Sequence, residues 1–238
     1  MKIALIGYGK MGKAIEEIAL ERNHQVVLKI NDENLDAFTE NNLGVADVAI
    51  EFTGPHSAYD NLQKLISFGK PVVCGSTGWT DKLPEIIALC REKEGSFLYA
   101  SNFSVGVNLF FELNKKLAGL MAAYPEYEVS LEEIHHTQKK DAPSGTAITL
   151  AEQVLEKISR KTGWVNEQTT DTSQLSIISK REDGAPCIHV VKYSSPIDDI
   201  EIIHTAHNRK GFALGAVLAA EYISNKKGIF DMKQVLGI

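Results

Sequence analysis

The residues best suited to chemistry lie in one run near the middle of the chain, residues 132–146. The run contains two adjacent histidines, His135 and His136, and then Lys139, followed by a Pro-Ser-Gly-Thr turn. Histidine titrates near neutral pH, and a positioned lysine can also donate a proton. Three cationic or protonatable side chains so close together therefore predict a local site that binds a small anion and transfers protons.

Two elements must position this run. Residues from Tyr127 to Ile134 alternate apolar and polar side chains, which predicts a half-buried strand. Apolar residues from Ala147 to Ile158 recur at helical spacing, so the turn should lead into a helix whose first N–H groups face the anion. The alternative is a basic loop that ends in an ordinary helix start, with Ser144 or Thr146 as the N-cap.

A second candidate site lies at the start of the chain. Lys2–Ile6 is a short apolar strand, and the sequence Gly-Tyr-Gly-Lys-Met-Gly follows it directly before a helical pattern. A G-x-G-x-x-G turn between a strand and a helix is typical of dinucleotide-binding folds, where the glycines allow a tight turn and a close approach to the pyrophosphate. The residues of this turn that we expect to contact a cofactor are Gly7, Tyr8, Gly9, Lys10, Met11 and Gly12.

The acid that follows the next strand bears on the choice of cofactor. Asp32 lies about 20 residues after Gly12, where an acidic residue commonly binds the ribose hydroxyls of NAD. Glu33 follows it and would repel the 2′-phosphate of NADPH. We therefore predict a preference for NADH, although Lys10 or Lys29 could assist NADPH. The alternative for Asp32 is a solvated turn residue.

Further strands and helices alternate up to about residue 102, which predicts a parallel, Rossmann-type sheet. Ligands of such sheets bind at the carboxyl ends of the strands, where this chain has turns rich in Gly, Ser, Thr and Asn. The residues of these turns that we expect to line the cofactor are Thr53, Gly75, Ser76, Thr77, Ser101, Asn102 and Phe103.

The second half of the chain has a different pattern. A helical stripe from Val105 to about Met121 precedes four predicted strands, which indicate an α+β domain with a four-stranded mixed or antiparallel sheet. The predicted strands are Tyr127–Ile134, Leu175–Lys180, Ile188–Tyr193 and Ile200–Ala206. We expect Asp183-Gly184 to form a hairpin turn and residues 162–173 to form a mobile loop. The predicted domains are residues 1–102 completed by 213–238 for the dinucleotide, and residues 103–212 for substrate binding and oligomerisation.

Composition excludes several classes of protein. The net charge of −6 argues against a nucleic-acid partner. The three cysteines are too far apart for a disulfide framework or a metal-ligand spacing, and His204 and His207 would point to opposite faces of a strand. We therefore expect no metal. No apolar run approaches about 18 residues and no signal peptide is visible, so we expect a cytoplasmic protein without membrane contact.

The motifs together resemble one family, the dihydrodipicolinate (4-hydroxy-tetrahydrodipicolinate) reductases of bacterial lysine and diaminopimelate synthesis. The most specific match is Glu133-Ile134-His135-His136 with Lys139 and the segment 141–147, and the segment 102–108 also matches. The resemblance implies reduction of a small cyclic dicarboxylate by NADH or NADPH, and a homotetramer built through the second sheet. Two features depart from the family's pattern. The glycine turn is one residue shorter, and Glu33 stands where an arginine often follows the ribose acid.

The resemblance also implies roles for single residues. His135 would be the general acid or base, and Lys139 would be the proton donor. His136, Gly145 and Thr146 would hold the substrate carboxylates. Arg209, which precedes a predicted helix, falls where the family has an arginine near the substrate.

Two other functions remain open on the sequence. The first is another Rossmann amino-acid dehydrogenase, such as a diaminopimelate or aspartate dehydrogenase. The second is a non-enzymatic regulator that binds NADH and uses the basic run to sense a metabolite.

Overall fold

The computed structural model describes the whole chain, residues 1–238, and divides it into two compact units. The first unit contains residues 1–108 and 209–238, and the second unit contains residues 109–208. The sequence placed the boundaries at residues 102 and 213 instead. The first division in the structure falls inside helix α5 (Val105–Met121), and the second falls before helix α7 (Lys210–Ile223).

The first unit is built around a six-stranded sheet in which every strand is parallel to its neighbours. The strands are β1 (Lys2–Ile6), β2 (Gln25–Ile30), β3 (Val48–Glu51), β4 (Val72–Cys74), β5 (Ser96–Tyr99) and β11 (Gly228–Phe230). Their order across the sheet is β2-β1-β3-β4-β5-β11, so the direction of winding reverses at β1 and β3. This reversal is the switch point at which doubly wound sheets bind their ligands.

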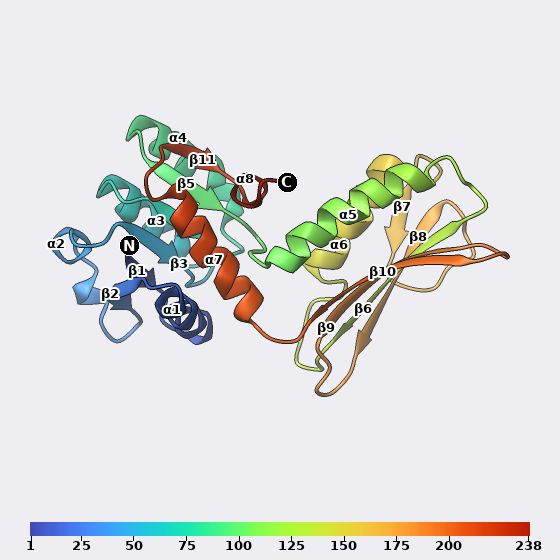
Figure 1. The fold of residues 1–238 in the computed structure, drawn as a ribbon, viewed down its shortest axis with the longest axis horizontal. Coiled ribbons are helices and arrows are strands. Elements are labelled where there is room, and N and C mark those ends of the chain that lie inside the picture. Colours follow the sequence, from blue (N-terminus) through green and yellow to red (C-terminus); the bar gives the residue numbers. More distant parts are fainter. The chain divides into compact units, whose positions relative to one another are not determined.

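Helices cover both faces of this sheet (Figure 1). The apolar sides of α1 (Lys10–Glu21), α7 and α8 (Met232–Leu236) share one core with β1 and β3. The apolar sides of α3 (Ala58–Ser67) and α4 (Leu83–Glu92) share a second core with the opposite side of the strands. Three short helices, α2 (Glu40–Leu43), η1 (Leu35–Ala37) and η2 (Thr80–Lys82), lie in the connections.

The second unit has a five-stranded sheet with α5 and α6 (Gly145–Lys157) packed on one face (Figure 1). The strands are β6 (Glu128–His135), β7 (Gly163–Val165), β8 (Gln174–Arg181), β9 (Cys187–Ser194) and β10 (Asp199–Ala206). Their order is β10-β9-β6-β8-β7. The pairs β6–β8 and β7–β8 are parallel, whereas β6–β9 and β9–β10 are antiparallel.

The predicted fold class, a parallel Rossmann-type sheet plus an α+β domain with a mixed sheet, is confirmed, but two details were wrong. The segment 162–173 is not only a loop, because it contains β7, which adds a fifth strand at the edge of the sheet. The short length of β7 and its polar neighbours hid it from periodicity. Asp183-Gly184 does not join a hairpin, because β6 lies between β8 and β9.

None of the helices is both long enough and apolar enough to cross a lipid bilayer. His204 lies in β10, where its ring packs at 5.8 Å from the ring of Phe110. His207 lies beyond the end of that strand and is exposed. The prediction assumed that both histidines lie in one regular strand. That assumption was wrong, because β10 ends at Ala206.

Candidate active site

The glycine turn after β1 is held close to the neighbouring strands. Gly7 has a φ of +97°, and the carbonyl of Ile30 accepts hydrogen bonds from the N–H groups of Gly7 and Tyr8, both at 2.9 Å. A Cβ on Gly7 would lie 2.2 Å from the carbonyl oxygen of Phe52, and one on Gly12 would lie 2.4 Å from the carbonyl oxygen of Gly7. Both positions therefore require glycine. Glycine at these positions allows the tight turn and the close packing of α1 against it.

A cavity of about 560 Å³ opens at this turn, at the carboxyl ends of β1, β2 and β3. Its volume is typical of a small-molecule site, and it lies at the switch point of the sheet. The predicted cofactor residues that line it are Gly7, Tyr8, Gly9, Asp32 and Thr53. Glu33 lines it as well. The structure thus brings together the glycine turn and the predicted ribose acid.

The other predicted cofactor residues are not part of this lining. They are Lys10, Met11, Gly12, Gly75, Ser76, Thr77, Ser101, Asn102 and Phe103. Ser76 is buried beside the cavity, and its hydroxyl accepts a hydrogen bond of 2.8 Å from the N–H of Thr53. The side chain of Phe103 is buried in the core and packs at 5.5 Å from the ring of Phe52, so that side chain serves the fold.

Two charged residues near the turn have structural partners. Lys29, considered above as a residue for NADPH, has its Nζ 2.5 Å from a carboxylate oxygen of Glu16 and 4.9 Å from the centre of the Tyr8 ring. The sequence reasoning missed Glu51, a fully buried carboxylate at the end of β3. It accepts hydrogen bonds from the N–H and the hydroxyl of Thr53, and from the thiol of Cys74. Glu51 therefore fixes the Thr53 turn on the cavity wall.

The second unit holds a buried cluster around the end of β6. His135 is the last residue of this strand and is 6% exposed, and Glu133 on the same face is fully buried. One carboxylate oxygen of Glu133 lies 3.6 Å from Nδ1 of His135, which is too long for a hydrogen bond. Nδ1 therefore has no hydrogen-bond partner in the structure.

Glu133 stays ionised because several donors surround it. The backbone N–H of Ser144 lies 3.1 Å from both carboxylate oxygens, and Nη2 of Arg181 lies 3.1 Å from one of them. Burial works to raise the pKa of Glu133, but hydrogen bonds from Ser144, Ser179 and Arg181 outweigh burial and lower it. Glu133 therefore links the start of α6 and the end of β8 to β6, the strand that ends in His135.

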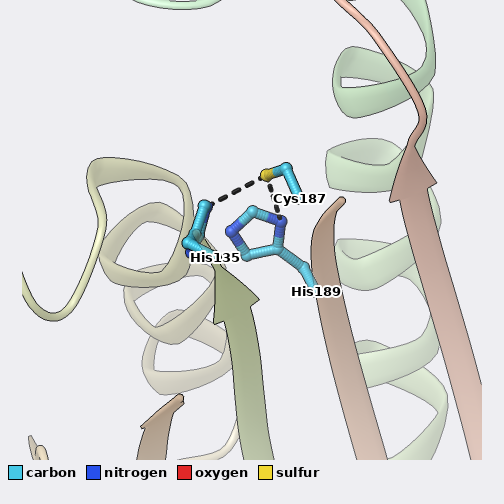
Figure 2. A group of neighbouring side chains, drawn as sticks. All are labelled: His135, Cys187 and His189. Carbon is cyan, nitrogen blue, oxygen red and sulfur yellow. Dashed lines mark hydrogen bonds between the residues drawn. The ribbon is translucent and has the colours of Figure 1, made fainter. Parts of the chain in front are cut away.

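His189 and Cys187 reach the same cluster from β9, the antiparallel neighbour of β6 (Figure 2). The Cys187 Sγ lies 3.0 Å from Nε2 of His135 and 3.8 Å from Nδ1 of His189. The other ring nitrogen of His189 lies 3.2 Å from the Ser144 hydroxyl and 3.7 Å from Glu133. Burial lowers the pKa of His135, and repulsion from Lys139 and Arg181 adds to this effect, while Glu133 opposes it.

The loop after β6 carries the predicted proton donor. The ammonium group of Lys139 donates to both carboxylate oxygens of Asp141 at 2.8 Å, and Arg181 donates to the backbone carbonyl of Asp141 at 2.6 Å. The hydrogen bond from Lys139 lowers the pKa of Asp141. This short loop is therefore tied to β8 and holds Lys139 in a defined place within the second unit.

The remaining predicted substrate residues lie near surfaces. His136 and Gly145 are exposed, and Thr146 is half-buried in the first turn of α6. Ser144 is the N-cap of that helix, and its hydroxyl accepts from the N–H of Ala147 at 3.2 Å. Arg209 is exposed and precedes α7, so it belongs to the first unit.

Sequence reasoning missed most of the cluster around His135. Glu133 was part of the matched motif but received no role, and Arg181, Cys187 and His189 were not singled out. A usable signal was the alternation within β9, which places His189 on the buried face together with Val191 and Tyr193. The pairing of β9 with β6 brings Cys187 and His189 to His135, and this pairing could not be recognised from the sequence pattern.

A parallel sheet with a glycine turn and a ligand-sized cavity at its switch point, joined to a separate α+β unit, defines the class of two-domain proteins with a Rossmann-type fold. Solved structures of this class share the fold. One is the diaminopimelate dehydrogenase of C. glutamicum in complex with DAP, with a TM-score of 0.53 and 13% identity over 98% of this chain and 92% of that one.

Within that class, the chain belongs to the dihydrodipicolinate reductase family. The family's N-terminal model matches residues 1–103, and its C-terminal model matches residues 106–236. A 4-hydroxy-tetrahydrodipicolinate reductase of Christiangramia forsetii is 50% identical over 236 residues, 99% of this chain and 98% of the relative. A dipicolinate-bound dihydrodipicolinate reductase from Paenisporosarcina sp. TG-14 has a TM-score of 0.77 and 25% identity, and the match covers 97% of each chain. The predicted family is thus confirmed.

Proposed function

We propose that this protein reduces 4-hydroxy-tetrahydrodipicolinate to tetrahydrodipicolinate with a nicotinamide cofactor, in lysine and diaminopimelate biosynthesis. The observation that carries the proposal is the 50% identity, over almost the whole length of both chains, to a reductase of that name. The site supports it, because the second unit places a buried histidine and a positioned lysine beside a helix N-terminus.

The first unit fits a nicotinamide dinucleotide. The space that a Cβ on Gly7 or Gly12 would need is filled by backbone, and the resulting turn borders a cavity that also contains Asp32. Gly7, Gly9 and Thr53 would hold the cofactor along this wall, and Asp32 would bind the adenosine ribose. When bound, the nicotinamide ring supplies a hydride.

The second unit would hold the dicarboxylate substrate. The first turn of a helix presents N–H groups that have no intrahelical acceptors, and Gly145 and Thr146 occupy that turn in α6. With His136 and Lys139 they provide several donors for two carboxylates. The family resemblance alone suggests that Arg209 makes a further, bidentate contact with a substrate carboxylate.

The protein's chemical task is protonation. Loss of the 4-hydroxyl group as water gives a conjugated C=C–C=N system. Hydride addition to that system leaves a carbanion or enamine that must take up a proton. Lys139 would donate this proton, held in place by Asp141. His135 would act as a general acid or base, with Glu133 behind its ring.

For the cofactor we propose a preference for NADH. Asp32 and Glu33 both line the cavity, so a 2′-phosphate there would meet two carboxylates. Lys29, a cation that could offset them, is paired with Glu16. The ratio of kcat/KM for NADH to that for NADPH tests this preference, and a ratio below one would refute it.

We also propose a homotetramer assembled through the second unit. The helices α5 and α6 cover one face of its sheet, and the edge strand β10 carries Ile203, which is 58% exposed. Ile197, just before β10, is 88% exposed. Large apolar side chains at such levels of exposure favour a protein interface. Light scattering coupled to size exclusion should give four times the chain mass, and a monomeric mass would refute the assembly.

The function is tested by following NADH oxidation with freshly generated 4-hydroxy-tetrahydrodipicolinate. Turnover that depends on this substrate supports the proposal, and its absence with both NADH and NADPH overturns it. The rival amino-acid dehydrogenases are tested in the same format with an oxo-acid and ammonia. The likeness to the diaminopimelate dehydrogenase concerns the fold alone.

A further inference from the structure

We propose that His135, Cys187 and His189 form a binding site for Zn²⁺ in the second unit, and that zinc bound there inhibits the enzyme. The metal site itself follows from the geometry of the cluster. Only its inhibitory effect rests on the proposed function.

The three candidate ligand atoms already converge. The Sγ of Cys187 contacts both rings, 3.0 Å from Nε2 of His135 and 3.8 Å from Nδ1 of His189 (Figure 2). All three candidate ligand atoms lie within 4.8 Å of one another. A tetrahedral zinc with ordinary Zn–S and Zn–N bonds would require sulfur–nitrogen separations of about 3.5 Å. The two sulfur–nitrogen distances differ from that value by about 0.5 Å or less. The two ring nitrogens would also have to approach each other to about 3.3 Å, which requires a movement of the rings.

The groups around the cluster are of the kind that orient the ligands in known metal sites. A histidine ligand normally has its second ring nitrogen directed at a carboxylate, a carbonyl or water, which fixes the ring and raises its basicity. Here the second nitrogens of both rings face one oxygen of Glu133, at 3.6 Å for His135 and 3.7 Å for His189. Ser144 lies 3.2 Å from the same nitrogen of His189.

The buried ring of His135 lacks a strong hydrogen-bond partner at either nitrogen, so Nε2 is available to a metal. His135 is 6% exposed, yet its Nδ1 has no hydrogen-bond partner, and its Nε2 has only the weak thiol contact. Buried ring nitrogens are normally paired. A metal on Nε2 would require hydrogen on Nδ1, and a small rotation would then let Nδ1–H donate to Glu133.

The donor set selects the metal. One thiolate and two imidazoles suit Zn²⁺, whereas Mg²⁺ and Ca²⁺ prefer oxygen ligands. Three protein ligands leave a fourth position for water or another small ligand. Nδ1 of His135 faces Glu133, so Nε2 is the nitrogen available for proton exchange. Zinc bound to Nε2 would block that exchange. The expected effect is reversible inhibition.

Metal binding is tested without turnover. Untagged protein, reduced and freed of metal, is titrated with Co²⁺ and then with Zn²⁺. We expect one Co²⁺ per chain, a thiolate-to-cobalt charge-transfer band, visible bands of tetrahedral cobalt, and displacement by Zn²⁺ but not by Mg²⁺. Cys187→Ser should abolish the charge-transfer band, and Glu133→Gln should weaken Zn²⁺ binding by about 10- to 100-fold. Cys90→Ser and His207→Gln, outside the cluster, should bind as the wild type does.

No charge-transfer band in the wild type, or the same band in Cys187→Ser, would overturn the site. The wild-type spectrum needs no variant, so a folding defect in one variant leaves the proposal testable. Inhibition is measured separately, with each protein normalised to its own metal-free rate. Zinc should inhibit the wild type, a chelator should restore it, and Cys187→Ser should need at least about tenfold more zinc. Zinc binding with unchanged turnover would overturn the inhibitory role, whereas failure of the proposed reaction would leave the cobalt result intact.

Discussion

Glu133 and His135 lie on the same face of β6, with a carboxylate oxygen of Glu133 3.6 Å from Nδ1 of His135. Removing this charge with Glu133→Gln should lower the pKa of His135 further, because the carboxylate is the main group that raises it. We expect kcat to fall by about 10- to 100-fold. If protonated His135 is the acid, the alkaline limb of the pH–rate profile should move to lower pH. Glu132→Gln, where the native carboxylate pairs with Lys180 at 2.7 Å, is the control on the same strand and should keep the wild-type profile.

Lys139→Ala tests the proton donor. The substitution removes the ammonium group that Asp141 holds at 2.8 Å, so kcat at saturating substrate should fall on the order of 10²- to 10⁴-fold. Lys140→Ala removes an exposed charge of the same loop and should leave kcat within about twofold of the wild type. Equal turnover of the two variants would show that Lys139 does not deliver the proton.

The stability of the fold should depend on pH through His189. Burial lowers the pKa of His189 to about 3, and repulsion from His135 contributes. The unfolded chain binds this proton near pH 6.5 and the folded chain does not, so stability falls as the pH drops from 6.5 towards 3. At pH 5 the loss should be about 2 kcal/mol relative to neutral pH.

Chemical denaturation at neutral pH and at pH 5 measures this effect. His189→Gln should lose less stability than the wild type on acidification, by the amount just given, whereas His207→Gln should behave as the wild type does because the native His207 is exposed. An identical acid response in His189→Gln and the wild type would contradict the prediction.

Glu33→Arg tests the choice of cofactor. The substitution replaces a carboxylate on the cavity wall with a guanidinium that can bind a 2′-phosphate. The kcat/KM for NADPH relative to NADH should rise by about tenfold or more. Glu92→Arg makes the same charge change on α4 and should leave the ratio unaltered. A ratio that does not respond to Glu33→Arg would place the adenosine ribose elsewhere.

Two glycines in helices form a matched pair. A Cβ on Gly12 would lie 2.4 Å from the carbonyl oxygen of Gly7, whereas a Cβ on Gly119 in α5 would meet nothing within 4 Å. Gly12→Ala should therefore destabilise the protein by about 1–3 kcal/mol and weaken cofactor binding. Gly119→Ala should stabilise it by up to about 1 kcal/mol, because alanine is the better helix former. Thermal midpoints that shift in the same direction would contradict this account.

The sequence by itself determined the local elements and both chemical motifs. Apolar periodicity predicted helix α5 from Val105 to Met121, as observed, because one helical face must be buried whatever its neighbours are. The turn from Gly7 to Gly12 was equally visible, because backbone crowding there admits only glycine at its two ends. His135 and Lys139 were visible because they are close together in the chain.

Only the tertiary structure decided what surrounds His135. Alternation shows which side of a strand is buried, but it does not show which strand lies next to it. The insertion of β6 between β8 and β9 therefore could not be predicted, and it brings Arg181 and Cys187 to the end of β6. Cys187 and His135 are 52 positions apart and lie 3.0 Å apart in space. That contact, and the buried carboxylate of Glu133 behind it, exist because long-range strand pairing assembles them.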